Sequence, residues 1–199
     1  MKPLLTVVVL ILSLVLTGIA SGPPPTPAAP VSVNSVGVIG TVNEPGDHLV
    51  VTGQVFAPDG VTPSPNVIVY AYQTDTTGEY HNDGSGVARL HGWAKTDEQG
   101  RFEFRTIRPG SYPGHSVPAH IHFHIYGGGY PLQWTPELMF ANDRLLKPEQ
   151  ISASAALGKF GGIQTVTRSS DGTQRCTFNI RASKTTNYPA GAVMEPQKQ

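Results

Sequence analysis

Short apolar runs separated by turn residues dominate the chain from residue 48 onward. The run HLVVTGQVFA (48–57) ends at the turn PDG, and NVIVYAYQT (66–74) is rich in the β-branched and aromatic residues that favour strands. GRFEFRTI (100–107) and AHIHFHIY (119–126) alternate residue by residue, which is the period of a strand with two different faces. A shorter strand is expected in ELMFAND (137–143). Strands are therefore predicted to form most of the fold.

The last third of the chain adds a predicted hairpin and a predicted helix. GIQTVTR and QRCTFNIRA flank the turn SSDG (169–172), which is typical of a β-hairpin. One short helix is predicted over Lys147–Leu157, where Pro148 suits the first turn. Long helical periodicity is otherwise scarce, so we expect an all-β fold: a β-sandwich of mostly antiparallel strands with a short helix and long loops.

The first 20 residues are typical of an export signal. Met1-Lys2 precedes a long apolar run, and Gly18 and Ala20 are placed like the small residues of a cleavage site. A retained N-terminal anchor is the alternative, because the run is close to the length of a membrane span. Either reading predicts a secreted or extracytoplasmic protein, in a periplasm or at a cell surface.

One domain is expected to follow this signal. Residues 21–46, which begin with SGPPPTPAAP, are predicted to be a Pro-rich linker and lead-in, residues 47–184 the folded domain, and residues 185–199 a C-terminal tail. The formal net charge is zero and no basic tract occurs, so nothing indicates a nucleic-acid partner. Cys176 is the only cysteine, which excludes an intrachain disulfide. The oligomeric state is left open.

Histidines and tyrosines are the candidate chemical groups. His120, His122 and His124 alternate with apolar residues and share one strand face. Such a face can bind a metal, but the spacing does not say which histidines are ligands, and each is equally readable as a surface residue. Tyr80 and Tyr112 taken singly are ordinary edge or turn tyrosines.

Taken together, these segments resemble the intradiol ring-cleavage dioxygenases, the family of protocatechuate 3,4-dioxygenase and catechol 1,2-dioxygenase. The shared segments are the D-x-x-G-x-Y pattern that ends at Tyr80, the TDEQGRFEFRTIRPGSYP stretch that contains Tyr112, and PAHIHF (118–123). The resemblance spans roughly residues 49–180. Within the family, the chain resembles an exported, single-domain branch. It implies that the sandwich is transthyretin-like.

The resemblance also implies a cofactor and a reaction. One Fe(III) per chain would be bound by Tyr80, Tyr112, His120 and His122, and this hard cation favours anionic oxygen donors. The implied enzyme is an oxidoreductase of aromatic compound catabolism. It inserts both atoms of O2 into a catechol between the hydroxyl-bearing carbons, giving a cis,cis-muconate-type dicarboxylic acid. Tyr112 is the implied catalytic base.

The chain departs from the family pattern around the pocket. Val117 stands where the intracellular enzymes have an arginine, Glu137 stands at the position of a family glutamine, and the stretch between Tyr112 and His120 is short. These changes predict a more open and less positive pocket, which disfavours carboxylated catechols. The expected pocket residues are Val117, His124, Glu137 and His115, and the candidates to replace the charge missing at Val117 are Arg89, Arg105 and His115.

Three other readings compete with this one. A secreted transthyretin-like binding module would share the TD-x-x-G-x-F-x-F and PG-x-Y patterns, but it does not account for Tyr80 together with PAHIHF. A family member that binds metal without cleaving rings is the second alternative. A zinc hydrolase is the third, although zinc rarely takes two tyrosines.

Overall fold

A computed structural model describes residues 26–81, 84–114 and 117–187. The predicted signal or anchor (1–20), His115 and the end of the predicted tail therefore lie outside the described residues. Within the described ranges no helix is both long and apolar enough to cross a membrane.

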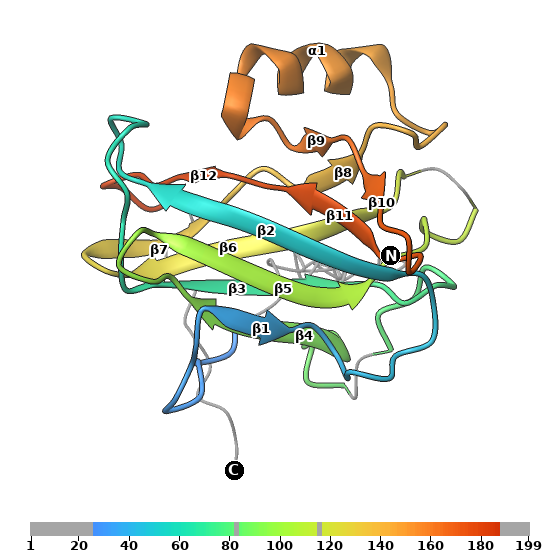
Figure 1. The fold of residues 1–199 in the computed structure, drawn as a ribbon, viewed down its shortest axis with the longest axis horizontal. Coiled ribbons are helices and arrows are strands. Elements are labelled where there is room, and N and C mark those ends of the chain that lie inside the picture. The colour runs from blue at the N-terminus through green and yellow to red at the C-terminus, as the bar shows by residue number, and fades with distance from the viewer. Residues whose placement is uncertain (1–25, 82–83, 115–116, 188–199) are drawn as a thin grey trace, which may run out of the picture.

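The first of two sheets contains the N-terminal and C-terminal strands (Figure 1). β2 pairs with β5 in antiparallel register and with β11 in parallel register, and β1 adds a parallel strand on the outer side of β5. The order across the sheet is β1 (Val36–Val38), β5 (Arg101–Ile107), β2 (His48–Phe56), β11 (Gln174–Thr177) and β10 (Thr167–Arg168), with β12 (Ile180–Arg181) also paired to β2.

The second sheet carries the histidine-rich strand near its centre. β3 and β6 pair in antiparallel register over seven residue pairs, and this pairing places Tyr72 opposite His122 and Tyr70 opposite His124. The order is β4 (Leu90–Lys95), β3 (Val67–Gln73), β6 (His120–Gly127), β8 (Leu138–Phe140) and β9 (Ile163–Gln164), with β7 (Tyr130–Trp134) also paired to β6.

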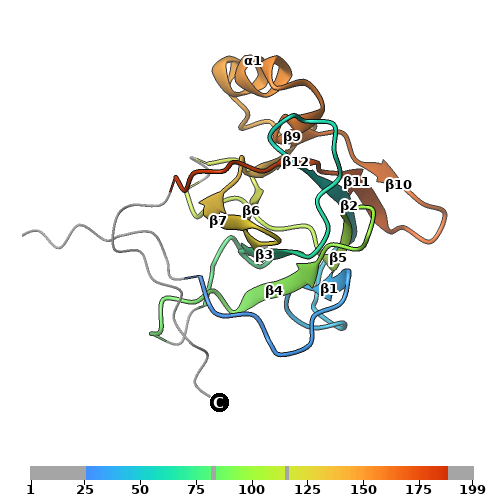
Figure 2. The ribbon, with the colours of Figure 1, turned by 90° about the vertical axis from the view of Figure 1, so that its left-hand side faces the viewer.

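Apolar side chains from the facing sides of the two sheets form one core. Figure 2 shows the two layers from the side, with the strands of the second sheet on the left. Phe104 and Phe123 pack edge to face across the interface, with ring centroids 6.0 Å apart. Ile121, Phe123 and Ile125 of β6 are at most 1% exposed, so one face of β6 is fully committed to this core. The histidines of β6 consequently lie on the opposite, outer face of the second sheet.

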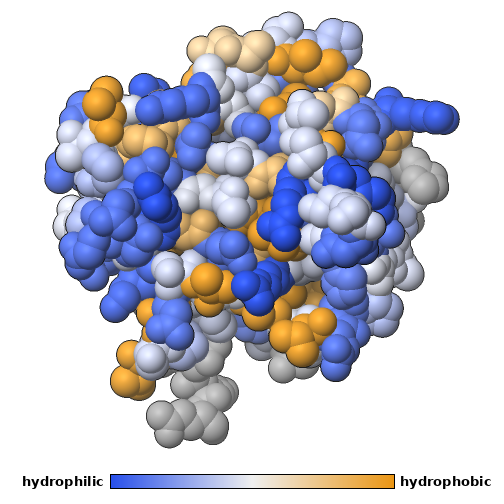
Figure 3. All heavy atoms as spheres, in the orientation of Figure 1, coloured by the Kyte–Doolittle hydropathy of each residue, from blue (hydrophilic) through white to orange (hydrophobic). Residues whose placement is uncertain are grey.

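The single described α-helix lies outside this sandwich. α1 (Pro148–Ala156) has no buried residue and is followed by the 3-10 turn η1 (Gly158–Phe160). Ile151 and Leu157 remain exposed there, and apolar atoms are visible at the top of the space-filling view (Figure 3). The helix matches the predicted range closely, and its exposure explains why its sequence shows little helical amphipathicity.

The all-β sandwich predicted from the sequence is confirmed, and six of the ten strand pairings are antiparallel. Part of the stretch predicted as linker and lead-in packs on the domain, within residues 26–46. Thr26 and Ile39 are almost fully buried, and Glu44 accepts two hydrogen bonds from Arg89. β4 and β7 also form from segments in which the sequence predicted no strand.

Candidate metal centre

β6 supplies two of the four candidate ligands from one rigid strand. His120 is only 4% exposed and His122 is partly buried, and both project from the outer face of the second sheet. Tyr72 of β3 stacks on the His122 ring with a centroid distance of 4.5 Å and an interplanar angle of 14°. The strand pairing and this stack together fix the position of His122.

Two loops bring the tyrosines to the same place. Tyr80 lies in the loop after β3, and Tyr112 lies in the loop after β5. The loops interlock: Gly110 N–H donates to the Asp75 carbonyl at 2.7 Å, and a Cβ on Gly78 would lie 2.0 Å from the Ser111 carbonyl oxygen. Gly78 also has φ +87°, a conformation that glycine adopts without strain. The glycines of the two motifs therefore allow the loop contact that places Tyr80 beside Tyr112.

Four donor atoms converge where these elements meet. The Tyr80 hydroxyl oxygen lies 2.6 Å from that of Tyr112 and 3.0 Å from Nε2 of His122. His120 Nε2 lies 3.0 Å from His122 Nε2. The structure thus brings together all four residues that the sequence singled out as metal ligands.

The hydrogen-bond partners on the Nδ1 side of His120 and His122 indicate which ring nitrogen carries the proton. They leave the Nε2 atoms, which face the donor cluster, without one. His120 Nδ1 lies 2.7 Å from the Pro118 carbonyl oxygen, which can only accept, so Nδ1 carries the proton. His122 Nδ1 lies 3.2 Å from Oε1 of Glu137, a carboxylate that likewise favours a proton on Nδ1. Both Nε2 atoms then present lone pairs to each other at 3.0 Å. Two such atoms repel unless a cation binds both of them.

Burial favours the uncharged forms of Tyr80, Tyr112 and His122. Burial raises the pKa of Tyr80 far above its usual value, and the hydrogen bond to Tyr112 raises it further. Burial also raises the pKa of Tyr112. Burial, followed by the neighbouring His120 and His124, lowers the pKa of His122 to about 3. A bound cation reverses this balance for the phenols, because it stabilises phenolate strongly. Two phenols and two unprotonated imidazole nitrogens therefore suit a hard, highly charged cation.

Sequence comparison identifies the family. A profile of a family described as dioxygenase matches residues 21–183. The chain belongs to the intradiol dioxygenase family. This confirms the resemblance that the motifs around Tyr80, Tyr112 and His120 indicated.

Curated relatives are longer than this chain. The β chain of protocatechuate 3,4-dioxygenase from Burkholderia cepacia is 33% identical over 118 residues, which are 53% of this chain and 50% of that relative. A 6-chlorohydroxyquinol 1,2-dioxygenase from Cupriavidus pinatubonensis is 30% identical over 155 residues, 68% of this chain and 53% of that relative. This intradiol family member thus spans about half the length of the curated relatives it matches.

Solved structures share its fold. The dioxygenase domain of a dioxygenase carbohydrate-binding protein fusion from Streptomyces sp. SirexAA-E is 28% identical, with a TM-score of 0.59 over 81% of this chain and 93% of that one. Catechol 1,2-dioxygenase from Acinetobacter sp. ADP1 gives a TM-score of 0.63 over 89% of this chain and 67% of that one. At 21% identity, the second likeness supports the sandwich fold alone.

The structure describes the surroundings of two of the other predicted pocket residues, His124 and Val117. His124 is 3% exposed, and its Nδ1 lies 2.5 Å from the Thr26 hydroxyl, so it belongs to the outer face of the sheet beside the centre. Val117 is partly buried just before the first histidine ligand candidate, and His115 lies outside the described residues. Of the candidates for the missing charge, Arg89 pairs with Glu44, and Arg105 pairs with Glu103.

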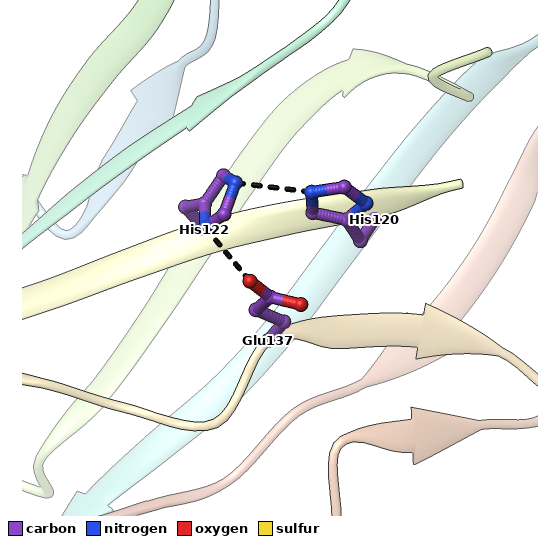
Figure 4. Close-up of side chains that lie close together, drawn as sticks. All are labelled: His120, His122 and Glu137. Atoms are coloured by element: carbon purple, nitrogen blue, oxygen red, sulfur yellow. Dashed lines mark hydrogen bonds and ion pairs between the residues drawn. The ribbon is translucent and has the colours of Figure 1, made fainter. Parts of the chain in front are cut away.

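Glu137, the fourth expected pocket residue, makes a contact with His122 that the sequence did not indicate. His120, His122 and Glu137 each offer a ligand atom, and these atoms lie within 4.8 Å of one another. Figure 4 shows, however, that Glu137 contacts His122 on the ring side away from His120. The only sequence signal for this arrangement was the alignment of Glu137 with a glutamine of the family pattern.

Proposed function

We propose that the chain is a ferric intradiol dioxygenase that converts a catechol and O2 into a cis,cis-muconate-type dicarboxylic acid. The observation that carries the proposal is the convergence of the His120 and His122 Nε2 atoms, 3.0 Å apart, with two phenol oxygens that are themselves 2.6 Å apart. Tyr80, Tyr112, His120 and His122 would hold the iron. Both atoms of O2 enter the product, so the reaction is balanced without an external reductant.

The residues of the chain would divide the work around the iron. When bound, ferric iron would draw electron density from the catechol oxygens and make the ring reactive toward O2. Tyr112 would take up a proton from the substrate hydroxyl, because its oxygen lies at the edge of the donor cluster: it contacts the Tyr80 hydroxyl, whereas the Tyr80 hydroxyl also contacts His122 Nε2. The β6 histidines and Tyr80 would keep their positions, since the sheet holds the histidines and the Tyr80 hydroxyl contacts His122.

We propose uncharged catechols as the substrate class. Val117 removes a positive charge, and Glu137 adds a negative one, relative to the family pattern. Arg89 and Arg105 both pair with carboxylates elsewhere, which supports the view that neither replaces that charge. A substrate carboxylate would therefore meet no compensating cation from these residues and would be repelled by Glu137.

The colour and oxygen uptake of the iron-loaded protein test the proposal. The Fe(III)–tyrosinate complex should give a broad visible band, and oxygen uptake with catechol should give the cis,cis-dicarboxylic product. Uptake with 3,4-dihydroxybenzoate should be slower than with catechol. Tyr80→Phe should weaken the band. A colourless ferric complex, or an extradiol semialdehyde product, contradicts the proposed reaction. A coloured complex that takes up no oxygen with any catechol indicates a metal-binding member without ring cleavage.

We also propose that the protein is exported. The support is the charged start, apolar run and small residues within positions 1–20. N-terminal sequencing of the protein recovered from its host should show a start downstream of Ala20. An intact Met1 in a membrane fraction would favour the retained anchor, and an intact Met1 in the soluble cytoplasmic fraction would contradict export.

A further inference from the structure

Glu137 occupies a fixed place beside one of the two candidate histidine ligands. Its Oε1 lies 3.2 Å from His122 Nδ1, while Nε2 of the same ring faces Tyr80 and His120 (Figure 4). The imidazole of His122 therefore lies between the carboxylate and the donor cluster. Within the part of the chain that the structure describes, His120 forms no ion pair with a carboxylate, and its Nδ1 donates to the Pro118 carbonyl.

The backbone around Glu137 holds the carboxylate there. Glu137 immediately precedes β8, which pairs with β6 in the register Met139 opposite His120 and Leu138 opposite Ile121. On its other side β8 pairs with β9, and Met139 N–H donates to the Gly162 carbonyl at 2.9 Å. Leu138 is fully buried. The strand that carries Glu137 is thus fixed on both edges and by its core side chain.

We propose that Glu137 is a positioning residue for His122, which fixes the Nδ1–H tautomer and lends negative charge to this imidazole. The inference rests on the proposed function and deepens it. A carboxylate behind a ligand imidazole orients the ring and raises its basicity toward the metal. A backbone carbonyl orients the ring without a full charge. The two histidines would therefore be unequal donors, with His122 the stronger.

The added charge distinguishes this chain from the glutamine pattern of its family. A glutamine amide oxygen could accept the same Nδ1 proton, so orientation alone does not require an acid. The Glu137 side chain is 38% exposed and borders a cavity of about 220 Å³ that Tyr72 and Trp134 also line. Solvent there screens part of the charge. The orientation effect should consequently be the larger of the two, and the charge effect should be measurable but smaller.

Two substitutions separate the effects. Glu137→Gln keeps an acceptor at the same place and removes the charge, whereas Glu137→Ala removes both. Glu98→Gln is the matched control, because it makes the same charge change at an exposed turn residue of the loop 97–100. Each variant is first compared with wild type by thermal unfolding of the apoprotein. If only Glu137→Ala has a lowered melting temperature, its lower stability is a second cause of any loss of metal binding. The correctly folded Glu137→Gln protein then tests the effect on the metal without that second cause.

The first measurement needs no iron. Long-range ¹⁵N–¹H correlation spectra of the apoprotein at neutral pH report which ring nitrogen of His122 carries the proton. Wild type and Glu137→Gln should show the Nδ1–H tautomer, and Glu137→Ala should show a mixture. A His122 that holds its proton on Nε2 in wild type, or the same tautomer in all variants, overturns the positioning role.

The second measurement uses ferric iron. Glu137→Ala should lower iron affinity by about 10- to 100-fold, the usual effect of removing an outer partner of a metal-bound histidine. Glu137→Gln should lower affinity less, but it should raise the Fe(III)/Fe(II) potential and move the tyrosinate-to-iron band to lower energy. Glu98→Gln should match wild type. A Glu137→Gln protein with an unchanged band and potential overturns the charge part of the inference. A wild-type chain that binds no ferric iron overturns the proposed function itself, and the tautomer result then shows whether the Glu137 contact exists without it.

Discussion

Gly78→Ala tests whether the two tyrosine loops position the centre through their contact. The new Cβ would lie 2.0 Å from the Ser111 carbonyl oxygen, whereas ordinary contacts begin at 3.4 Å, so the loops must move apart by about 1 Å or more. At φ +87° an alanine also costs about 1–2 kcal/mol of folding free energy. A displacement of about 1 Å in a catalytic group typically costs about 100-fold in rate.

We therefore expect Gly78→Ala to lose about 100-fold in oxygen-uptake rate, with only about 1–2 kcal/mol lost in stability. Gly172→Ala is the matched control, because Gly172 has φ +85° and nothing within 4 Å of an added Cβ. It should show the stability loss without the loss of activity. The assays are oxygen uptake with catechol, visible titration with ferric iron, and urea unfolding of each apoprotein. Equal activity in the two variants would refute the view that loop contact places Tyr80 beside Tyr112.

Three further predictions concern stability and metal. Thr106→Val removes the hydroxyl that donates to Oε1 of the fully buried Gln73 at 3.0 Å, so urea unfolding should show a loss of about 1–3 kcal/mol, and an unchanged midpoint would argue against that bond. Thr26→Val removes a contact to buried His124, and about 1 kcal/mol should be lost with the visible band of the iron form retained; a loss of the band would place Thr26 in the centre instead. Iron at 100 times its dissociation constant should stabilise the fold by about 2.7 kcal/mol, which raises the melting temperature by about 5–10 °C, and chelation should reverse this. An iron form that melts with the apoprotein would contradict binding to the folded state.

The strands that the sequence predicted are those whose pattern records burial directly. β6 alternates because Ile121 and Phe123 enter the core while His120 and His122 face outward. β3 is buried at six of its seven residues and rich in β-branched and aromatic residues, so its composition alone identifies a strand. In both cases the burial of each residue follows from its own place along a regular strand, so the local sequence is sufficient to predict the strand.

The missed elements depend on partners far along the chain. β1 is only three residues long and exists through parallel pairing with β5, which no local pattern records. Thr26 lies within a proline-rich stretch that is typical of a spacer, yet it is buried against His124. Polar and proline-rich segments can pack when a distant surface offers hydrogen-bond partners, and only the folded chain provides that surface.

The candidate centre shows the same division between local motif and distant contact. The four donors that the family motifs singled out lie together in the structure because each motif carries its own constraint: alternation for the histidines, and glycines for the tyrosine loops. Glu137 belongs to no such motif, and its link to His122 arises only from the pairing of β8 with β6. Relative to the family pattern, the valine at position 117 would remove a positive charge near the donors and the acid at position 137 would add a negative one. Both changes would favour the ferric state and disfavour anionic substrates. The residues around the ligands, rather than the ligands themselves, would therefore distinguish the substrate choice and iron chemistry of this chain from those of the family pattern.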